Sequence, residues 1–253
     1  MMPILQIGPL AIQLPGLLLI LGIYLGLWLA ERYSSRYKVA PNTLYSLVLL
    51  TLITGFIGAR LSYVLRYPEI FTSNPGSLFS LNYTLLDQFG GISVAMLGAL
   101  VYGQKKGLSF WSTLDALTPL LAAFAITLAL AHIASGSAFG AVTKKPWGIE
   151  LWGAKRHPSQ IYEAVTASLI LVILWPARQW IKRLVSGGYF LSFCALTSLS
   201  VLFLEAFRGD SILLPGGFRL PQVLAMLILL LSLYGLKKSA VYPVEEKVSF
   251  TSS

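Results

Sequence analysis

The chain has 253 residues, of which 56% are hydrophobic and only 11% are charged, and its formal net charge is +9. Soluble domains carry roughly 25% charged residues, so this composition excludes an ordinary soluble fold. The basic residues lie between apolar segments, which favours contact with lipid headgroups and no binding of nucleic acid.

Seven apolar segments follow one another along the chain and approach the roughly 20 residues that a membrane-spanning helix needs. They are predicted over residues 12–30, 44–64, 90–103, 119–139, 160–175, 189–207 and 221–236. The third is short and spans the bilayer only if the residues before it continue the helix. We therefore expect an all-α, polytopic integral membrane protein, with one transmembrane domain over residues 1–240 and a polar cytoplasmic tail over 241–253.

The basic residues in the loops predict how the spans are oriented. Of the 19 Lys and Arg residues, 11 lie in the loops and tail that follow the first, third, fifth and seventh segments, and seven lie in the other loops. Short loops rich in Lys and Arg remain cytoplasmic. We therefore expect the N-terminus outside and the C-terminus inside, with outer loops around residues 66–88, 140–158 and 208–220.

The outer loop before the fifth segment is the richest in functional side chains. It contains four basic residues suited to a phosphate group, namely Lys144, Lys145, Lys155 and Arg156. The segment HPSQIYE, from His157 to Glu163, then leads into the span. Pro158 suits a helix start, and Ser159, Tyr162 and Glu163 would lie within one turn.

Polar side chains within predicted spans are costly and usually functional. The candidates are Arg60, His132, Gln160, Glu163, Glu205 and Gln222. Each also has a structural explanation, such as a buried hydrogen bond, and Glu205 with Arg208 can form an ordinary (i, i+3) ion pair. With two histidines and no carboxylate cluster, the sequence predicts no metal site.

Several segments together resemble the bacterial prolipoprotein diacylglyceryl transferase family. The segment HPSQIYE is similar to a signature of that family, and other segments resemble its motifs in the same order. These segments are IGARLSYVL (57–65), Gly90-Gly91 with Ser93, SGSAFG (135–140), KPWGIE (145–150), FLEAFRGD (203–210) and Gln222. The resemblance implies seven spans with the N-terminus outside, in agreement with the loop charges.

The resemblance also implies a reaction, a location and partners. Family members transfer the diacylglyceryl group of phosphatidylglycerol to the lipobox cysteine thiol of a prolipoprotein, so that a thioether forms and glycerol phosphate leaves. We therefore expect a multi-pass enzyme of the bacterial inner (plasma) membrane that uses no cofactor. Its expected partners are phosphatidylglycerol, the prolipoprotein lipobox peptide and membrane lipids, and the protein is expected to be a monomer.

This chemistry suggests roles for particular side chains. The thiol must become a thiolate, and the leaving phosphate needs positive charge nearby. For an active enzyme, we expect Arg60 and Arg208 to bind the phosphate. We expect His132 to act as the general base, because it is predicted within a membrane span. The residues expected to bind substrate or brace the cavity are Ser135, Arg156, His157, Ser159, Gln160, Tyr162, Glu163 and Glu205.

The chain departs from the family pattern at four places. The Tyr of the family's Tyr-Gly pair is Pro15, its His-Gly-Gly reads Ala95-Met96-Leu97, an Arg is missing near His132, and another Arg is Val201. Replacing Arg with Val removes a charge from a phosphate site. Three alternatives therefore stay open: a catalytically silent relative that binds lipid or lipoprotein, a transferase with another lipid or acceptor, and a lipid carrier.

Overall fold

The structure is a computed structural model that describes residues 4–7, 10–73, 76 and 85–241. The expected tail lies outside these residues from position 242 onward, as does part of the expected outer loop at 66–88. The chain forms two compact units. Unit 1 comprises Met1–Tyr33 and Leu114–Ser253, and unit 2 comprises Ser34–Thr113.

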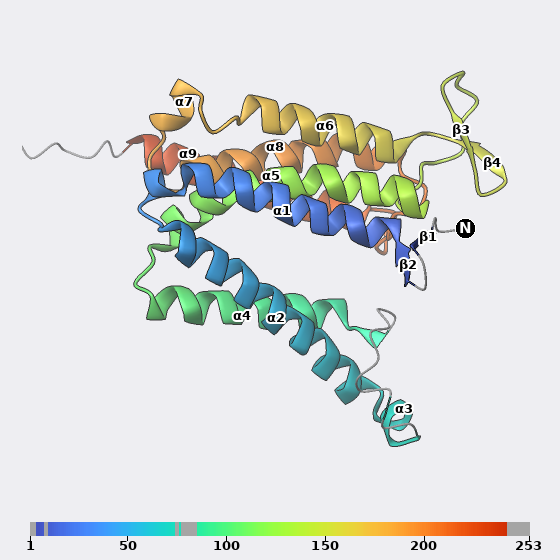
Figure 1. Ribbon diagram of the computed structural model, residues 1–253. Coiled ribbons are helices and arrows are strands. Elements are labelled where there is room, and N and C mark those ends of the chain that lie inside the picture. The colour runs from blue at the N-terminus through green and yellow to red at the C-terminus, as the bar shows by residue number, and fades with distance from the viewer. Residues whose placement is uncertain (1–3, 8–9, 74–75, 77–84, 242–253) are drawn as a thin grey trace, which may run out of the picture. The chain divides into compact units, whose positions relative to one another are not determined.

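Unit 1 is a helical bundle in which the long helices run in a common direction (Figure 1). α8 packs along α9 and also contacts α6. Two small antiparallel hairpins accompany the helices. The elements are β1 (Ile4–Ile7), β2 (Leu10–Gln13), α1 (Leu14–Ser34), α5 (Phe110–Ser135), β3 (Ile149–Leu151), β4 (Ala154–Arg156), α6 (Ser159–Ile173), α7 (Gln179–Lys182), α8 (Gly188–Leu204), the 3-10 turn η4 (Glu205–Phe207) and α9 (Leu220–Val241).

Buried polar contacts and close backbone packing hold unit 1 together. The Asp115 carboxylate accepts hydrogen bonds from the backbone N–H groups of Gly187 (2.6 Å) and Phe190 (2.8 Å), and so caps the start of α8. A Cβ on Gly26 would lie 2.9 Å from the backbone of Leu120, so α1 can approach α5 this closely only with glycine there.

The fourth apolar segment begins earlier than the sequence suggests. The span was expected from about Pro119, whereas α5 begins at Phe110 and continues through this proline. Membrane helices tolerate proline because nearby hydroxyl groups can satisfy freed carbonyls. The carbonyl that loses its helical N–H partner at Pro119 is that of Asp115. The Thr118 hydroxyl donates to the neighbouring carbonyl of Leu114 at 2.9 Å.

Unit 2 is built around one helix pair. It contains the 3-10 turn η1 (Ser35–Tyr37), α2 (Pro41–Arg66), α3 (Pro68–Ser73) and α4 (Gln88–Lys105). α2 and α4 pack together over much of their length. A Cβ on Gly58 would lie 2.3 Å from the Cβ of Val94, so the absence of a side chain on Gly58 sets their separation.

Among the described residues, five helices are long and apolar enough to cross a membrane: Leu14–Tyr37, Pro41–Arg66, Phe110–Ser135, Gly188–Phe207 and Leu220–Lys238. The apolar helix α6, Ser159–Ile173, is shorter. Helices also dominate the described chain, whose strands form only the two hairpins. The expectation of an all-α membrane protein is therefore confirmed.

Candidate functional site

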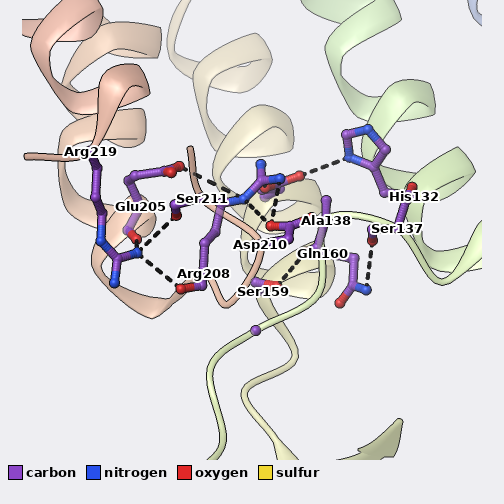
Figure 2. A network of polar contacts seen from close by, with 12 residues as sticks. His132, Ser137, Ala138, Ser159, Gln160, Glu205, Arg208, Asp210, Ser211 and Arg219 are labelled. Carbon is purple, nitrogen blue, oxygen red and sulfur yellow. Dashed lines mark hydrogen bonds and ion pairs between the residues drawn. The ribbon is translucent and has the colours of Figure 1, made fainter. Parts of the chain in front are cut away.

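Three polar side chains from separate segments meet at one end of unit 1 (Figure 2). His132 lies in the last turn of α5, Glu163 near the start of α6, and Arg208 directly after η4. His132 Nδ1 is 3.1 Å from Glu163 Oε2, and Arg208 Nη1 donates to Glu163 Oε1 at 3.2 Å. Glu163 therefore links the histidine to the arginine.

Carboxylates surround Arg208 on several sides. Its Nε and Nη2 each lie 3.0 Å from Asp210 Oδ1, and its Nε lies 3.8 Å from Glu205 Oε2. The (i, i+3) pair of Glu205 and Arg208 expected from the sequence is thus present. It is longer than the contacts of Arg208 with Glu163 and Asp210, so those two carboxylates decide where the guanidinium lies.

A second arginine holds the loop that carries Arg208. Arg219 donates to the backbone carbonyls of Glu205 and of Arg208, the latter at 2.9 Å, and to the Ser211 hydroxyl at 3.0 Å. The Gln222 side chain donates to the carbonyl of Leu202 at 3.2 Å and ties the start of α9 to the end of α8. The bonds of Arg219 hold the backbone on either side of Arg208 in place.

The Glu205 carboxylate lies in the interior, with only 3% of the residue exposed. Within the described part of the chain, its Oε1 has no hydrogen-bond partner. The network as a whole contains three carboxylates (Glu163, Glu205 and Asp210) against two guanidinium groups (Arg208 and Arg219). This end of unit 1 is therefore not a simple cationic pocket.

A cavity of about 300 Å³ opens beside this network. His132, Glu163, Glu205 and Arg208 line its polar end. Most of the other lining residues are apolar, among them Ala122, Ala125, Ala129, Ala167, Ile170, Val201 and Leu204, and the lining also includes Thr166, Thr197 and Ser200. From Ala122 to His132 the α5 wall extends roughly 15 Å at the usual helical rise. Such a lining suits a ligand with a polar head and an apolar chain.

The geometry gives His132 a defined chemical capacity. If Nδ1–H is donated to Glu163, the other ring nitrogen, Nε2, is left as a proton acceptor. A base that is oriented by a carboxylate is the arrangement that activates nucleophiles in many enzymes. His132 lines the cavity, so a proton donor bound there has a base on the wall beside it.

Ser159 and Gln160 serve to brace the site. The Ser159 hydroxyl donates to the carbonyl of Ala138 at 2.6 Å, and Gln160 Nε2 donates to that of Ser137 at 2.9 Å. Both residues are buried. They join the first turn of α6 to the loop after α5, where the Ser135 hydroxyl bonds that of Ser137 at 2.6 Å.

His157 and Tyr162 belong to an aromatic cluster beside the network. Their rings pack against Phe207, with centroid distances of 5.3 and 5.9 Å. Tyr162 also accepts a hydrogen bond from Trp147 Nε1 at 2.9 Å. The described side chains that line the cavity do not include these two residues, so they support its surroundings.

Two of the predicted arginines make contacts within their own segments. Arg156 donates to the carbonyls of Leu151 (3.1 Å) and Gly140 (3.3 Å), so it stabilises the loop between α5 and α6. Arg60 belongs to unit 2, where it donates to the carbonyl of Leu85 at 2.9 Å and lies over the Phe71 ring. The structure thus brings together His132, Glu163, Glu205 and Arg208 from the predicted set.

Asp210 and Arg219 were not predicted as site residues. Asp210 was part of the FLEAFRGD segment, and Arg219 was counted only as a basic residue of an outer loop. Only their positions in the sequence could have pointed to these residues as part of the site. Asp210 lies two residues after Arg208, and Arg219 directly precedes α9. No periodic pattern marks such loop contacts.

Comparison with known proteins gives a consistent result. The family described as prolipoprotein diacylglyceryl transferase matches residues 3–237. A phosphatidylglycerol–prolipoprotein diacylglyceryl transferase of Finegoldia magna is 27% identical, over 85% of this chain and 86% of that protein. Proteins of the same name from Bacillus mycoides (26% identical, over 90% and 88%) and Bacillus licheniformis (27%, over 89% and 87%) are also similar.

Proposed function

The chain belongs to the prolipoprotein diacylglyceryl transferase family, and we propose that it transfers the diacylglyceryl group of phosphatidylglycerol to the lipobox cysteine thiol of prolipoproteins. The observation that carries this proposal is the cavity of unit 1, in which a polar network adjoins a long apolar wall. A phospholipid has the same division between a charged head and apolar chains. A cavity of this kind can hold the reacting bond beside ionisable groups.

In the proposed reaction the cysteine sulfur attacks the terminal glycerol carbon of the diacylglyceryl group. A C–S bond forms, the C–O bond to the phosphate breaks, and glycerol phosphate leaves with the electron pair. The thiol proton must first pass to a base, because the thiolate is the nucleophile. His132 is the proposed acceptor of that proton through Nε2, with Glu163 orienting the ring.

The phosphate group of the donor is proposed to bind Arg208. A phosphate would take over the two N–H groups that now contact Asp210, whose side chain is partly exposed and can turn toward water. Glu163 would keep its own bond to Nη1 and hold the guanidinium in place. The sequence also predicts a phosphate contact for Arg60, which belongs to unit 2.

The remaining predicted residues are proposed to support this chemistry. Ser159 and Gln160 would hold the loop after α5, to which Ser135, the last residue of α5, is bonded through Ser137. His157 and Tyr162 would order the wall near Glu163. Glu205 would face the donor headgroup from the cavity wall, and Arg156 would stabilise the adjoining loop. No step of the proposed reaction requires a metal or a soluble cofactor.

The proposed function includes an arrangement in the bacterial inner membrane. α4 and α6 would add two spans to the five long apolar helices, giving seven spans in one transmembrane domain over residues 1–240. The N-terminus would lie outside and the C-terminus in the cytoplasm. The polar network would then face the outer side, where prolipoprotein substrates arrive, and the protein would act as a monomer.

One specific observation favours a second candidate, a catalytically silent relative that binds lipid or lipoprotein. Val201 lines the cavity at a position where the family pattern has Arg, so the wall lacks a charge there. The carboxylates around Arg208 also oppose an incoming anion. Under this reading the cavity would hold a lipid without cleaving it.

In vitro transfer separates the two candidates. The purified protein, labelled phosphatidylglycerol and a lipobox peptide are combined in mixed micelles, and the peptide mass is measured. Transfer predicts a gain of one diacylglyceryl group, its loss with Arg208→Ala, and no gain with a Cys→Ser peptide. If no adduct forms while a relative with the complete family pattern works, the silent reading holds. An adduct on another acceptor would indicate a different transferase.

A further inference from the structure

A β-hairpin projects beyond the ends of α5 and α6 (Figure 1). β3 and β4 pair with Leu151 opposite Ala154, so Trp152 and Gly153 alone form the connecting turn. Both have positive φ, 54° and 73°. Turns of this shape usually contain Asn and Gly, and a bulky residue there is strained. The tip therefore carries a tryptophan although the local backbone disfavours it.

The hairpin and its flanks carry an excess of positive charge. Residues 140–157 contain four basic side chains and a single acidic one, Glu150. Arg156 is engaged by backbone carbonyls of the same loop. The excess charge presented outward therefore comes from Lys144 and Lys145, which are exposed, and from the half-buried Lys155.

Large apolar surfaces lie among these lysines. Trp147 is 57% exposed and Trp152 is 59% exposed. Both indole N–H groups are already used, by Tyr162 Oη and by the carbonyl of Gly136, each at 2.9 Å. Much of each ring surface remains exposed, although Lys145 Nζ lies over the Trp147 ring, 5.8 Å from its centroid, and Val142 is exposed in the same loop. Aromatic rings with one polar end satisfied are typical of the membrane interface.

The position of the hairpin restricts what it can contact. It follows the last turn of α5 and leads into the first turn of α6, and both helices are apolar. The hairpin must therefore lie where the apolar helices end, at the level of the lipid headgroups. Lysines there attract anionic headgroups, and exposed rings can enter the boundary with the acyl chains. An acidic peptide would use the charge and leave the rings in water.

We propose that the hairpin surface formed by Lys144, Lys145, Lys155, Trp147 and Trp152 docks onto anionic phospholipid headgroups of the surrounding bilayer. The lipids concerned are bulk lipids of the leaflet and not the donor molecule in the cavity. This docking holds the loop between α5 and α6 against the membrane surface, and with it the carbonyls that Ser159 and Gln160 bind.

A local fluorescent probe on the full-length chain tests the proposal. The single cysteine, Cys194, is replaced by Ser, and Val142→Cys carries an environment-sensitive dye. Nanodiscs contain phosphatidylcholine, with or without phosphatidylserine, and some lipids have brominated acyl chains. Docking predicts that phosphatidylserine shifts the emission to shorter wavelength and increases quenching, and that high salt reverses both effects.

Two matched variants then separate the hairpin charge from overall charge. Lys144→Gln/Lys145→Gln/Lys155→Gln should lose the response to phosphatidylserine. Lys105→Gln/Lys106→Gln/Lys182→Gln removes the same charge from exposed sites in other loops and should keep the response. Raising the salt concentration with the labelled protein that keeps all its lysines also tests whether charge drives docking. This measurement does not depend on the folding of a lysine variant.

Three outcomes would overturn the proposal. The dye emission could be unchanged by phosphatidylserine, or it could change equally in the hairpin variant. It could also change only when an acidic peptide is added, which would make the hairpin a peptide-binding surface. No phosphatidylglycerol is present and no transfer is measured. Failure of docking therefore leaves the transferase reaction untouched, and a silent transferase can still dock.

Discussion

The two units use charged side chains in different ways. In unit 2, Asp87 caps α4 by accepting the N–H of Gly90 at 2.7 Å, and it pairs with Arg66 at 2.9 Å. Both partners lie close to the helix ends that they stabilise. In unit 1, ionisable groups from α5, α6 and the segment after η4 meet at the edge of a cavity.

The difference shows what distinguishes a structural charge from a candidate site. A charge near a helix end is ordinary when a local backbone or side-chain partner explains it, as with Asp87. Ionisable side chains 31 and 45 residues away in the sequence meet around Glu163, and an open volume lies beside them. Such convergence is not needed to cap a helix, so it indicates a role in binding or chemistry.

The largest expected effect would come from removing the proposed base. We expect His132→Ala to lower the rate of transfer to the lipobox peptide about 10²–10⁴-fold, because the thiol then lacks a positioned proton acceptor. Single-turnover transfer measures this rate. The Glu163→Gln variant, which can still orient the ring, should lose less. A His132→Ala protein with the full rate would show that His132 is not the base.

A second test concerns the contact between α2 and α4 in unit 2. Gly58→Val should lower the free energy of unfolding by about 1–3 kcal/mol, because the new side chain would overlap Val94. Unfolding in detergent micelles, followed by circular dichroism, measures the change. Gly103→Ala in α4 is the control, since no atom lies within 4 Å of its new Cβ. Equal stability of the Gly58→Val and wild-type proteins would contradict close packing of α2 on α4.

A smaller effect is expected when the cap of α4 is removed. Asp87→Ala should cost about 1 kcal/mol of unfolding free energy, because it removes the N-cap and the partner of Arg66. Asp87→Asn keeps a capping oxygen and should recover most of this loss. Arg66 is 60% exposed, so Arg66→Gln should cost little. If both Asp87 variants are equally unstable, the ion pair matters more than the cap.

The smallest effect is expected at the edge of the network. Asp210→Asn should lower the KM for phosphatidylglycerol about twofold to fivefold, because a competing carboxylate no longer pairs with Arg208. The value of kcat should change little, since Glu163 still holds the guanidinium. Initial rates at several donor concentrations measure both constants. A higher KM would mean that Asp210 positions Arg208 for the donor.

The positions of the apolar helices followed from the sequence because burial in lipid imposes long apolar runs. The expected segment 221–236 falls inside α9, and 160–175 nearly coincides with α6. The predicted start of the fourth span, near Pro119, was wrong because proline interrupts helices less often in membranes than in water. The β3–β4 hairpin was not predicted, since strands of three residues are too short to show alternation.

The candidate site was predictable only in part. Glu205 and Arg208 were paired from their spacing, which is a local rule. The bond between His132 and Glu163 was not predicted, although both residues were singled out, because nothing in a single sequence specifies which helices lie side by side. The contact of Asp210 with Arg208 depends on the path of a loop, which carries no periodic signal.

The bridge from Glu163 to Arg208 bears on how the protein is made. The carboxylate leaves the ribosome 45 residues before the guanidinium that neutralises it. Until α8 and the segment after it are synthesised, α6 carries an acidic group with only His132 as its partner in the network. A short helix with an unneutralised charge enters lipid poorly. In the proposed seven-span arrangement, stable insertion of α6 should therefore await α8, so that the two helices enter the bilayer as a pair.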